Sequence, residues 1–151
     1  MGFTTPSLKG RALRLLSQRE HSRVELERKL AKYEEVPGTL AAALDDLTAK
    51  DFISESRVVQ SVLHQRAPRL GAMRVRQELQ RKGIAPEAIV EAVAGLQESE
   101  LSRARDVWQR RFDAPPSDMK ERGRQMRFLL ARGFSGGVVT KVLKGGPSDD
   151  E

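Results

Sequence analysis

A repeat of about 50 residues constrains the fold of this 151-residue chain more than any other feature. Leu30, Leu79 and Leu129 recur 49 and 50 residues apart, and the sequence around them aligns without gaps across about two helices at each offset. Other equivalent residues are Leu26 and Val75, Pro37 and Pro86, and Lys82-Gly83-Ile84 and Arg132-Gly133-Phe134. Units of this size are marginal alone, so each must bury one face on a neighbour.

Hydrophobic residues within each unit have the spacing of amphipathic helices. Leu40, Leu44 and Leu47 lie at positions i, i+4 and i+7, and the same spacing returns in residues 89–96. No segment shows sustained alternation of polar and apolar residues. Aromatic residues make up only 5% of the chain, which is a poor supply for the core of a sandwich or barrel. The sequence therefore predicts an all-α fold of nine short helices.

Helix start and stop signals agree with that number of helices. Ser22 and Glu25 form a capping-box pattern, and Pro86 suits the first position of a helix. Gly83 and Gly133 each follow a basic turn, as expected where a helix ends in left-handed backbone. The predicted N-caps of four further helices are Thr39, Ser54, Ser117 and Ser135.

The repeat predicts three tandem three-helix units with helix-turn-helix-like geometry. Their expected bounds are 8–53, 54–98 and 99–144, followed by a flexible acidic tail at 145–151. Units stacked in a row, with helices at right angles, would make the array elongated. We therefore predict a radius of gyration clearly above the ~15 Å of an ordinary globular chain of this length. Small-angle scattering measures it, and a compact value would contradict the stacked arrangement.

Residues suited to catalysis or cofactor binding are scarce. The chain has no cysteine, which removes disulfides, thiolate metal sites and cysteine nucleophiles. The two histidines, His21 and His64, have no motif partner, and the adjacent Asp45 and Asp46 would point about 100° apart on a helix. We expect neither an enzyme nor a cofactor.

Charge and hydropathy indicate the kind of partner. No stretch approaches the ~18 apolar residues of a membrane span, so we expect a cytoplasmic protein that does not bind membranes. The net charge is +6 and the pI about 10.1, which favours polyanions or acidic protein surfaces as partners.

Basic residues are predicted to form an outward-facing surface. Positive charge increases toward the C-terminal half, where arginine outnumbers lysine and suits bidentate contacts to phosphate or carboxylate. Helical angles, with the apolar residues turned inward, place seven basic residues on exposed faces. These candidate partner-binding or DNA-facing residues are Arg74, Arg81, Arg103, Arg110, Lys120, Arg124 and Arg127.

Two segments resemble the signature of the RecX regulatory proteins. The first runs from Ala12 to Leu30 and the second from Arg66 to Ile84. The residues that carry this resemblance are His21, Ser22, Leu26, Leu30, Gly71, Leu79, Lys82 and Gly83. The segment Asp51-Phe52-Ile53-Ser54-Glu55 departs from the Gly-aromatic-Leu-Asp-Asp pattern usual in the family, and the third unit matches least.

The resemblance implies three tandem three-helix repeats and a regulatory function. RecX-like proteins bind the RecA recombinase on DNA, typically in the groove of its filament, and damp its ATPase and strand exchange. By that resemblance we expect a bacterial cytoplasmic monomer that reaches the nucleoid through RecA and acts in DNA repair and the SOS response.

Two other functions remain open from the residues themselves. Three short helices with tight turns also suit a helix-turn-helix-like DNA-binding protein of low sequence specificity. Direct DNA binding is expected to be weak and nonspecific, because no outward stripe pairs arginine with a clear base-reading set. An adaptor for another acidic protein is the third possibility.

Overall fold

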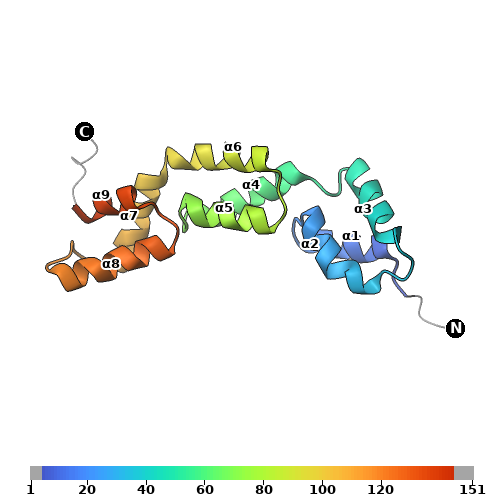
Figure 1. Ribbon diagram of the computed structural model, residues 1–151, viewed down its shortest axis with the longest axis horizontal. Helices are drawn as coiled ribbons and strands as arrows, with labels where there is room; N and C mark the ends of the chain where they lie inside the picture. The colour runs from blue at the N-terminus through green and yellow to red at the C-terminus, as the bar shows by residue number, and fades with distance from the viewer. Residues whose placement is uncertain (1–4, 145–151) are drawn as a thin grey trace. The chain divides into compact units, whose positions relative to one another are not determined.

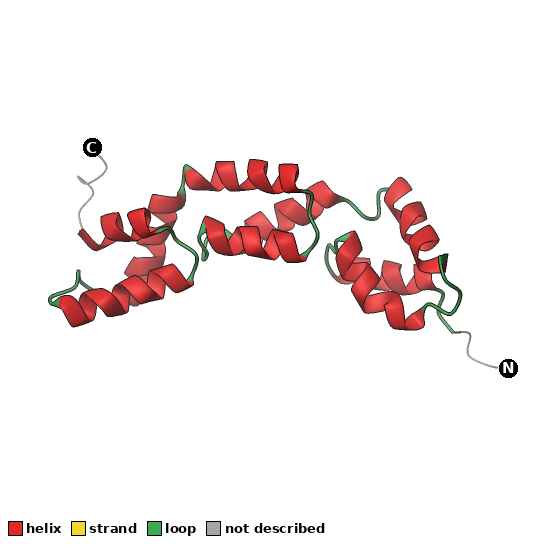
Figure 2. Ribbon diagram, viewed as in Figure 1, coloured by secondary structure: helices red, strands yellow, loops and turns green. Residues whose placement is uncertain are grey.

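The computed structural model describes residues 5–144, and within that range it contains helices and loops but no strand (Figure 2). The described helices are α1 (Leu8–Gln18), α2 (Arg23–Leu30), the short 3₁₀ helix η1 (Ala31–Tyr33), α3 (Thr39–Ala49), α4 (Glu55–Arg66), α5 (Ala72–Arg81), α6 (Pro86–Gln97), α7 (Glu100–Arg111), α8 (Met119–Ala131) and α9 (Gly136–Lys144). The prediction of an all-α fold with nine α-helices is confirmed for this range. The predicted tail lies outside the described residues.

The described residues divide into two compact units. The first contains the residues up to Ser61 together with Arg81–Ile84, and the second contains Val62–Gln80 and the residues from Ala85 onward. The middle repeat thus contributes to both units. The repeat boundaries near residues 53 and 98, and the elongation of the array, stay predictions.

The core of the first unit is built mainly from leucine. α1, α2 and α3 pack against one another (Figure 1), and Leu26 and Leu44 are completely buried between them. The cluster of buried residues consists of Ala12, Leu26, Leu30, Leu40, Leu44, Leu47 and Ile53. The i, i+4 and i+7 spacing seen in the sequence therefore marks the buried face of each helix.

The second unit contains a separate core in the third repeat. α7, α8 and α9 pack together (Figure 1), with Leu129 and Val139 completely buried. The Trp108 Nε1–H donates a hydrogen bond of 2.8 Å to Oε1 of Gln125, which is itself buried. The predicted inward position of Phe112 is confirmed, since its side chain is buried beside Phe128.

Most of the predicted helix signals are confirmed. Ser22 and Glu25 form the reciprocal capping box at the start of α2. The hydroxyl of Ser54 accepts from the Arg57 amide at 3.2 Å, and that of Ser135 accepts from the Val138 amide at 3.3 Å. These caps follow from residues only three positions apart, so sequence alone identifies them.

Two predicted N-caps are wrong. Thr39 is the first residue of α3, not its cap, and its hydroxyl donates backward to the Val36 carbonyl. Oε2 of Glu34 instead accepts from the Leu40 amide at 2.9 Å. At α8 the cap is Asp118 rather than Ser117, because a carboxylate at a helix N-terminus also gains from the helix dipole.

Candidate partner-binding surface

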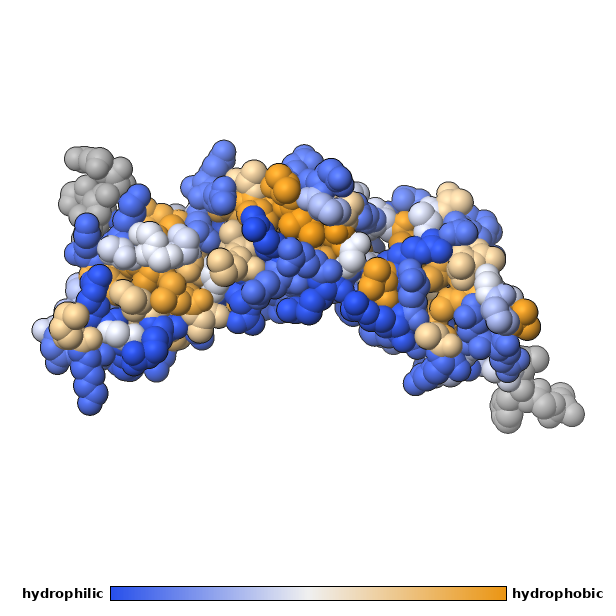
Figure 3. Space-filling model, in the orientation of Figure 1, coloured by the Kyte–Doolittle hydropathy of each residue, from blue (hydrophilic) through white to orange (hydrophobic). Residues whose placement is uncertain are grey.

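Six of the seven predicted basic residues lie on the exposed surface of their helices. They are Arg74, Arg81, Arg110, Lys120, Arg124 and Arg127. The face drawn in Figure 3 is largely hydrophilic, with separate apolar areas between the polar residues. Their role in binding stays a prediction.

Arg103 differs from the prediction, because its guanidinium is turned into the protein. Nη1 donates to the carbonyls of Ala67 and Leu70 at 2.7 and 2.6 Å, and Nη2 donates to that of Leu96 at 3.0 Å. Burial lowers the pKa of Arg103, and the nearby Glu100 opposes that shift. The side chain joins the ends of α4 and α6 to α7, so we assign it a structural role.

Arg74 is exposed but also structurally engaged. Its Nη1 donates to the Ala131 carbonyl at 2.8 Å, and its stem lies against Gly133 at the end of α8. Arg81 is engaged through its backbone, since its carbonyl accepts from Nη1 of Arg28 at 2.9 Å. Of Arg74 and Arg81, therefore, only Arg81 has a side chain that is available to bind a partner.

The third repeat retains the largest share of the predicted surface. Arg110, Lys120 and Arg127 are exposed, and none of them forms an ion pair with a described residue. Arg124 instead pairs with Glu121 at 2.9 Å, one helical turn earlier. Three of the predicted cations on α7 and α8 therefore have no ion-pair partner among the described residues.

Two arginines outside the predicted surface lie over aromatic rings in the same repeat. The Arg132 guanidinium lies 3.7 Å from the ring centre of Phe128, and that of Arg111 lies 5.2 Å from Phe112. Both rings belong to the core contacts between α7 and α8. Helical angles alone could not identify this cluster, because it forms only when the two helices pack.

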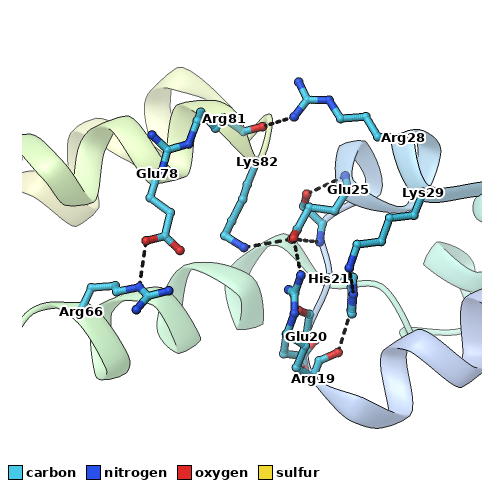
Figure 4. Close-up of polar contacts among 11 residues, drawn as sticks. Arg19, Glu20, His21, Glu25, Arg28, Lys29, Arg66, Glu78, Arg81 and Lys82 are labelled. Carbon is cyan, nitrogen blue, oxygen red and sulfur yellow. Dashed lines mark hydrogen bonds and ion pairs between the residues drawn. The ribbon is translucent and has the colours of Figure 1, made fainter.

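The residues around the start of α2 that carry the resemblance to RecX proteins have structural roles. His21 is buried, with Nδ1 3.0 Å from the Arg19 carbonyl and Nε2 3.1 Å from Nζ of Lys29 (Figure 4). Burial lowers the pKa of His21, although its contact with the Arg19 carbonyl opposes the shift. This environment favours a neutral imidazole that packs beside the Ser22 cap.

Glu25 links α2 to the turn that follows α5. Figure 4 shows the side chains of Arg19 and Lys82 directed at its carboxylate, at 2.7 and 3.1 Å. Gly83 in the same turn has a φ of +73°, and a Cβ there would overlap Val24. The turn that contains the signature pair Lys82-Gly83 therefore packs against α2 of the preceding repeat.

An equivalent joint connects the second and third repeats within the second unit. The Gly71 amide donates to the Arg132 carbonyl at 2.7 Å, and the Met73 amide donates to that of Gly133 at 3.3 Å. The buried carboxylate of Glu100 caps the same helix start by accepting from the Ala72 amide at 2.8 Å. In both joints the start of a repeat's second helix contacts the glycine turn of the next repeat.

Models of the RecX protein family match the chain in three consecutive segments. The first, second and third three-helix domains of RecX match residues 9–47, 54–93 and 98–143. The chain belongs to the RecX family. The prediction of three tandem three-helix repeats is thus confirmed.

Individual RecX proteins agree with this assignment. The regulatory protein RecX of Leptothrix cholodnii is 53% identical over 91% of this chain and 88% of its own length. That of Ralstonia nicotianae is 49% identical, with coverage of 92% and 87%. That of Pseudomonas fluorescens is 40% identical, with coverage of 97% and 96%. Membership of this family identifies a regulatory protein rather than an enzyme.

Two solved RecX structures share the fold. A crystal structure of regulatory protein RecX superposes with a TM-score of 0.74 at 19% identity, covering 91% of this chain and 72% of that one. RecX from Lactobacillus salivarius gives a TM-score of 0.68 at 21% identity, covering 91% and 92%. In residues 5–144, no helix has both the length and the apolar character of a membrane span.

Proposed function

We propose that this RecX-family protein binds the RecA filament on DNA and inhibits its ATPase and strand exchange. The observation that carries the proposal is the match to all three RecX domains in order, over nearly the whole described chain. Its setting is the bacterial cytoplasm, where the filament forms in DNA repair and the SOS response. The free protein is proposed to be a monomer.

Similar repeats provide a physical route to inhibition. Three units in tandem can contact successive subunits, and linked weak contacts gain affinity through their effective concentration. Inhibition then requires that the repeats bind one state of the filament more tightly than another. The unpaired cations Arg110, Lys120 and Arg127 are the residues that we assign to this contact.

The decisive experiment is the RecA ATPase on single-stranded DNA with this protein titrated in. We expect turnover to fall to a plateau. The variant Arg110→Gln/Arg127→Gln is expected to need about three- to tenfold more protein for half inhibition, because exposed interfacial charges contribute modestly and mainly to association.

Lys141→Gln/Lys144→Gln is the matched control, since it removes the same charge from exposed positions on α9. Its half-inhibiting concentration should stay within twofold of that of the unmodified chain. Unchanged turnover at saturating protein contradicts inhibition of RecA. Equal behaviour of the two double variants contradicts the assigned surface.

Low-specificity DNA binding is the second candidate function. It is favoured by a groove in the first repeat that is lined by Arg11, Arg14, Arg28, Lys29 and Lys32. Sequence readout by the third repeat is not supported, because Gln125 is buried against Trp108 and cannot reach a base edge. Helices that read DNA use exposed amide and guanidinium groups for that purpose.

A further inference from the structure

A groove between α1 and the α2–η1 segment concentrates positive charge in the first repeat. It has a volume of about 430 Å³ and is open to solvent. Its basic lining residues are Arg11, Arg14, Arg28, Lys29 and Lys32. Among the described residues, no carboxylate lines it. None of these five residues belongs to the basic surface predicted from the sequence.

Ion pairing divides the basic residues of the first unit into two groups. Outside the groove, every basic residue of this unit except Arg81 is paired with a carboxylate. These paired residues are Lys9, Arg19, Arg23, Lys50, Arg57 and Lys82. The five groove residues form no ion pair with any described residue. Clustered like charges repel one another and disfavour the folded state. Arg28 donates to the Arg81 carbonyl and Lys29 contacts His21, but neither contact neutralises a charge, so the groove favours binding of an anion.

Arg11 and Tyr33 form an aromatic platform in the lining of this groove. The Arg11 guanidinium lies 3.7 Å from the ring centre of Tyr33, and Nζ of Lys32 lies 5.2 Å from it. Tyr33 retains 38% exposure. Pro6, Arg11, Lys32 and Tyr33 also line a second hollow of about 500 Å³. The platform thus contributes to the lining of both hollows.

The basic groove is not required by the three-helix fold. At the 49-residue offset, Arg28, Lys29 and Lys32 correspond to Gln77, Glu78 and Arg81 of the second repeat. In the third repeat, 50 residues further on, the equivalents are Arg127, Phe128 and Ala131. Each of the other two repeats therefore folds with only one of these three charges, which favours a binding role for them in the first.

We propose that this groove binds single-stranded nucleic acid. Phosphates contact the exposed heads of Arg14, Arg28 and Lys32, and a base stacks on the platform of Arg11 and Tyr33. A docking peptide helix would need a stripe of apolar anchors, but Leu30 is buried and Leu15 partly so. A concave site of this size also suits one flexible strand better than a duplex. The proposal does not depend on RecA.

Anisotropy of a fluorescein-labelled oligothymidylate tests the proposal with the full chain. Arg14→Gln/Lys32→Gln is expected to weaken binding about 10- to 30-fold near 0.1 M salt, and to reduce the slope of log affinity against log salt by about 1.4. Tyr33→Ala is expected to weaken it at least about fivefold without changing the charge, whereas Tyr33→Phe should stay within twofold.

The control Lys141→Gln/Lys144→Gln removes the same charge outside the groove and should leave affinity within twofold. Equal losses in both double variants would mean attraction by net charge alone and would overturn the proposal. So would absence of binding, or equally effective competition by polyglutamate, which would identify an acidic protein as the partner. Self-association masking the groove would show as a larger species in sedimentation and would overturn it too. The RecA ATPase assay, run separately, reports on the proposed function.

Discussion

Gly71→Ala is expected to destabilise the second unit by about 3 kcal/mol or more. A Cβ at this position would overlap the backbone of Gly133 and Phe134, which cannot move aside as a flexible side chain can. The overlap would also break the hydrogen bonds from the Gly71 and Met73 amides to the turn after α8. Urea unfolding measures the loss, and hydrogen exchange at these two amides localises it to the joint.

Gly95→Ala provides the matched control for this substitution. Gly95 is exposed within α6, and a Cβ there would meet no atom within 4 Å. The alanine should stabilise the helix by about 0.5–1 kcal/mol. If Gly71→Ala left both the urea midpoint and the exchange rates unchanged, the close contact between the two turns would be refuted.

Glu25→Gln is expected to cost about 2–3 kcal/mol of stability at neutral pH. Desolvation raises the pKa of the Glu25 carboxyl, but contacts with Arg19, the Ser22 amide and Lys82 outweigh it and lower that pKa from 4.5 to about 2. The ionised carboxylate thus stabilises the folded chain above about pH 4.5, and this contribution is lost as the pH falls toward 2. Glutamine can still accept from the Ser22 amide, so the substitution removes mainly the ionic contacts.

Urea unfolding of both chains between pH 7 and pH 2 measures this contribution. The difference in unfolding free energy should be full at pH 7 and should shrink below pH 4.5. Glu27→Gln is the control on the same helix, because Glu27 is exposed and its pair with Arg23 is 3.5 Å long. It should change stability by less than about 0.5 kcal/mol. A difference for Glu25→Gln that did not vary with pH would exclude the ionic explanation.

Local features of the fold could be predicted from the sequence. The capping box at Ser22 and the left-handed Gly83 and Gly133 depend on residues a few positions apart, and the structure has them as expected. Thr39 failed as a cap because Glu34, at a longer separation, reaches the same helix start. The cap of α5 could not be predicted at all, since Glu100 belongs to the next repeat.

The candidate surface was only partly predictable for a related reason. A helical wheel shows which side of a helix is polar but not whether a neighbouring element covers that side. Arg103 lies on such a covered face, where three carbonyls accept from its guanidinium. The basic groove could not be predicted from the sequence, because its cations come from two segments, one of which ends in the unpredicted η1 helix.

The glycine turn gives the series of repeats a polarity. Each joint presents the start of a second helix on one side and a left-handed glycine on the other, so the two sides are not interchangeable. The first repeat has Glu34 at the position equivalent to Gly83, with a φ of −79°. At this position the first repeat therefore lacks the left-handed glycine turn, which is the side of the joint whose carbonyls accept hydrogen bonds. A permuted chain with this repeat moved to second or third place should fail to assemble, even though every repeat would still contain its own three helices.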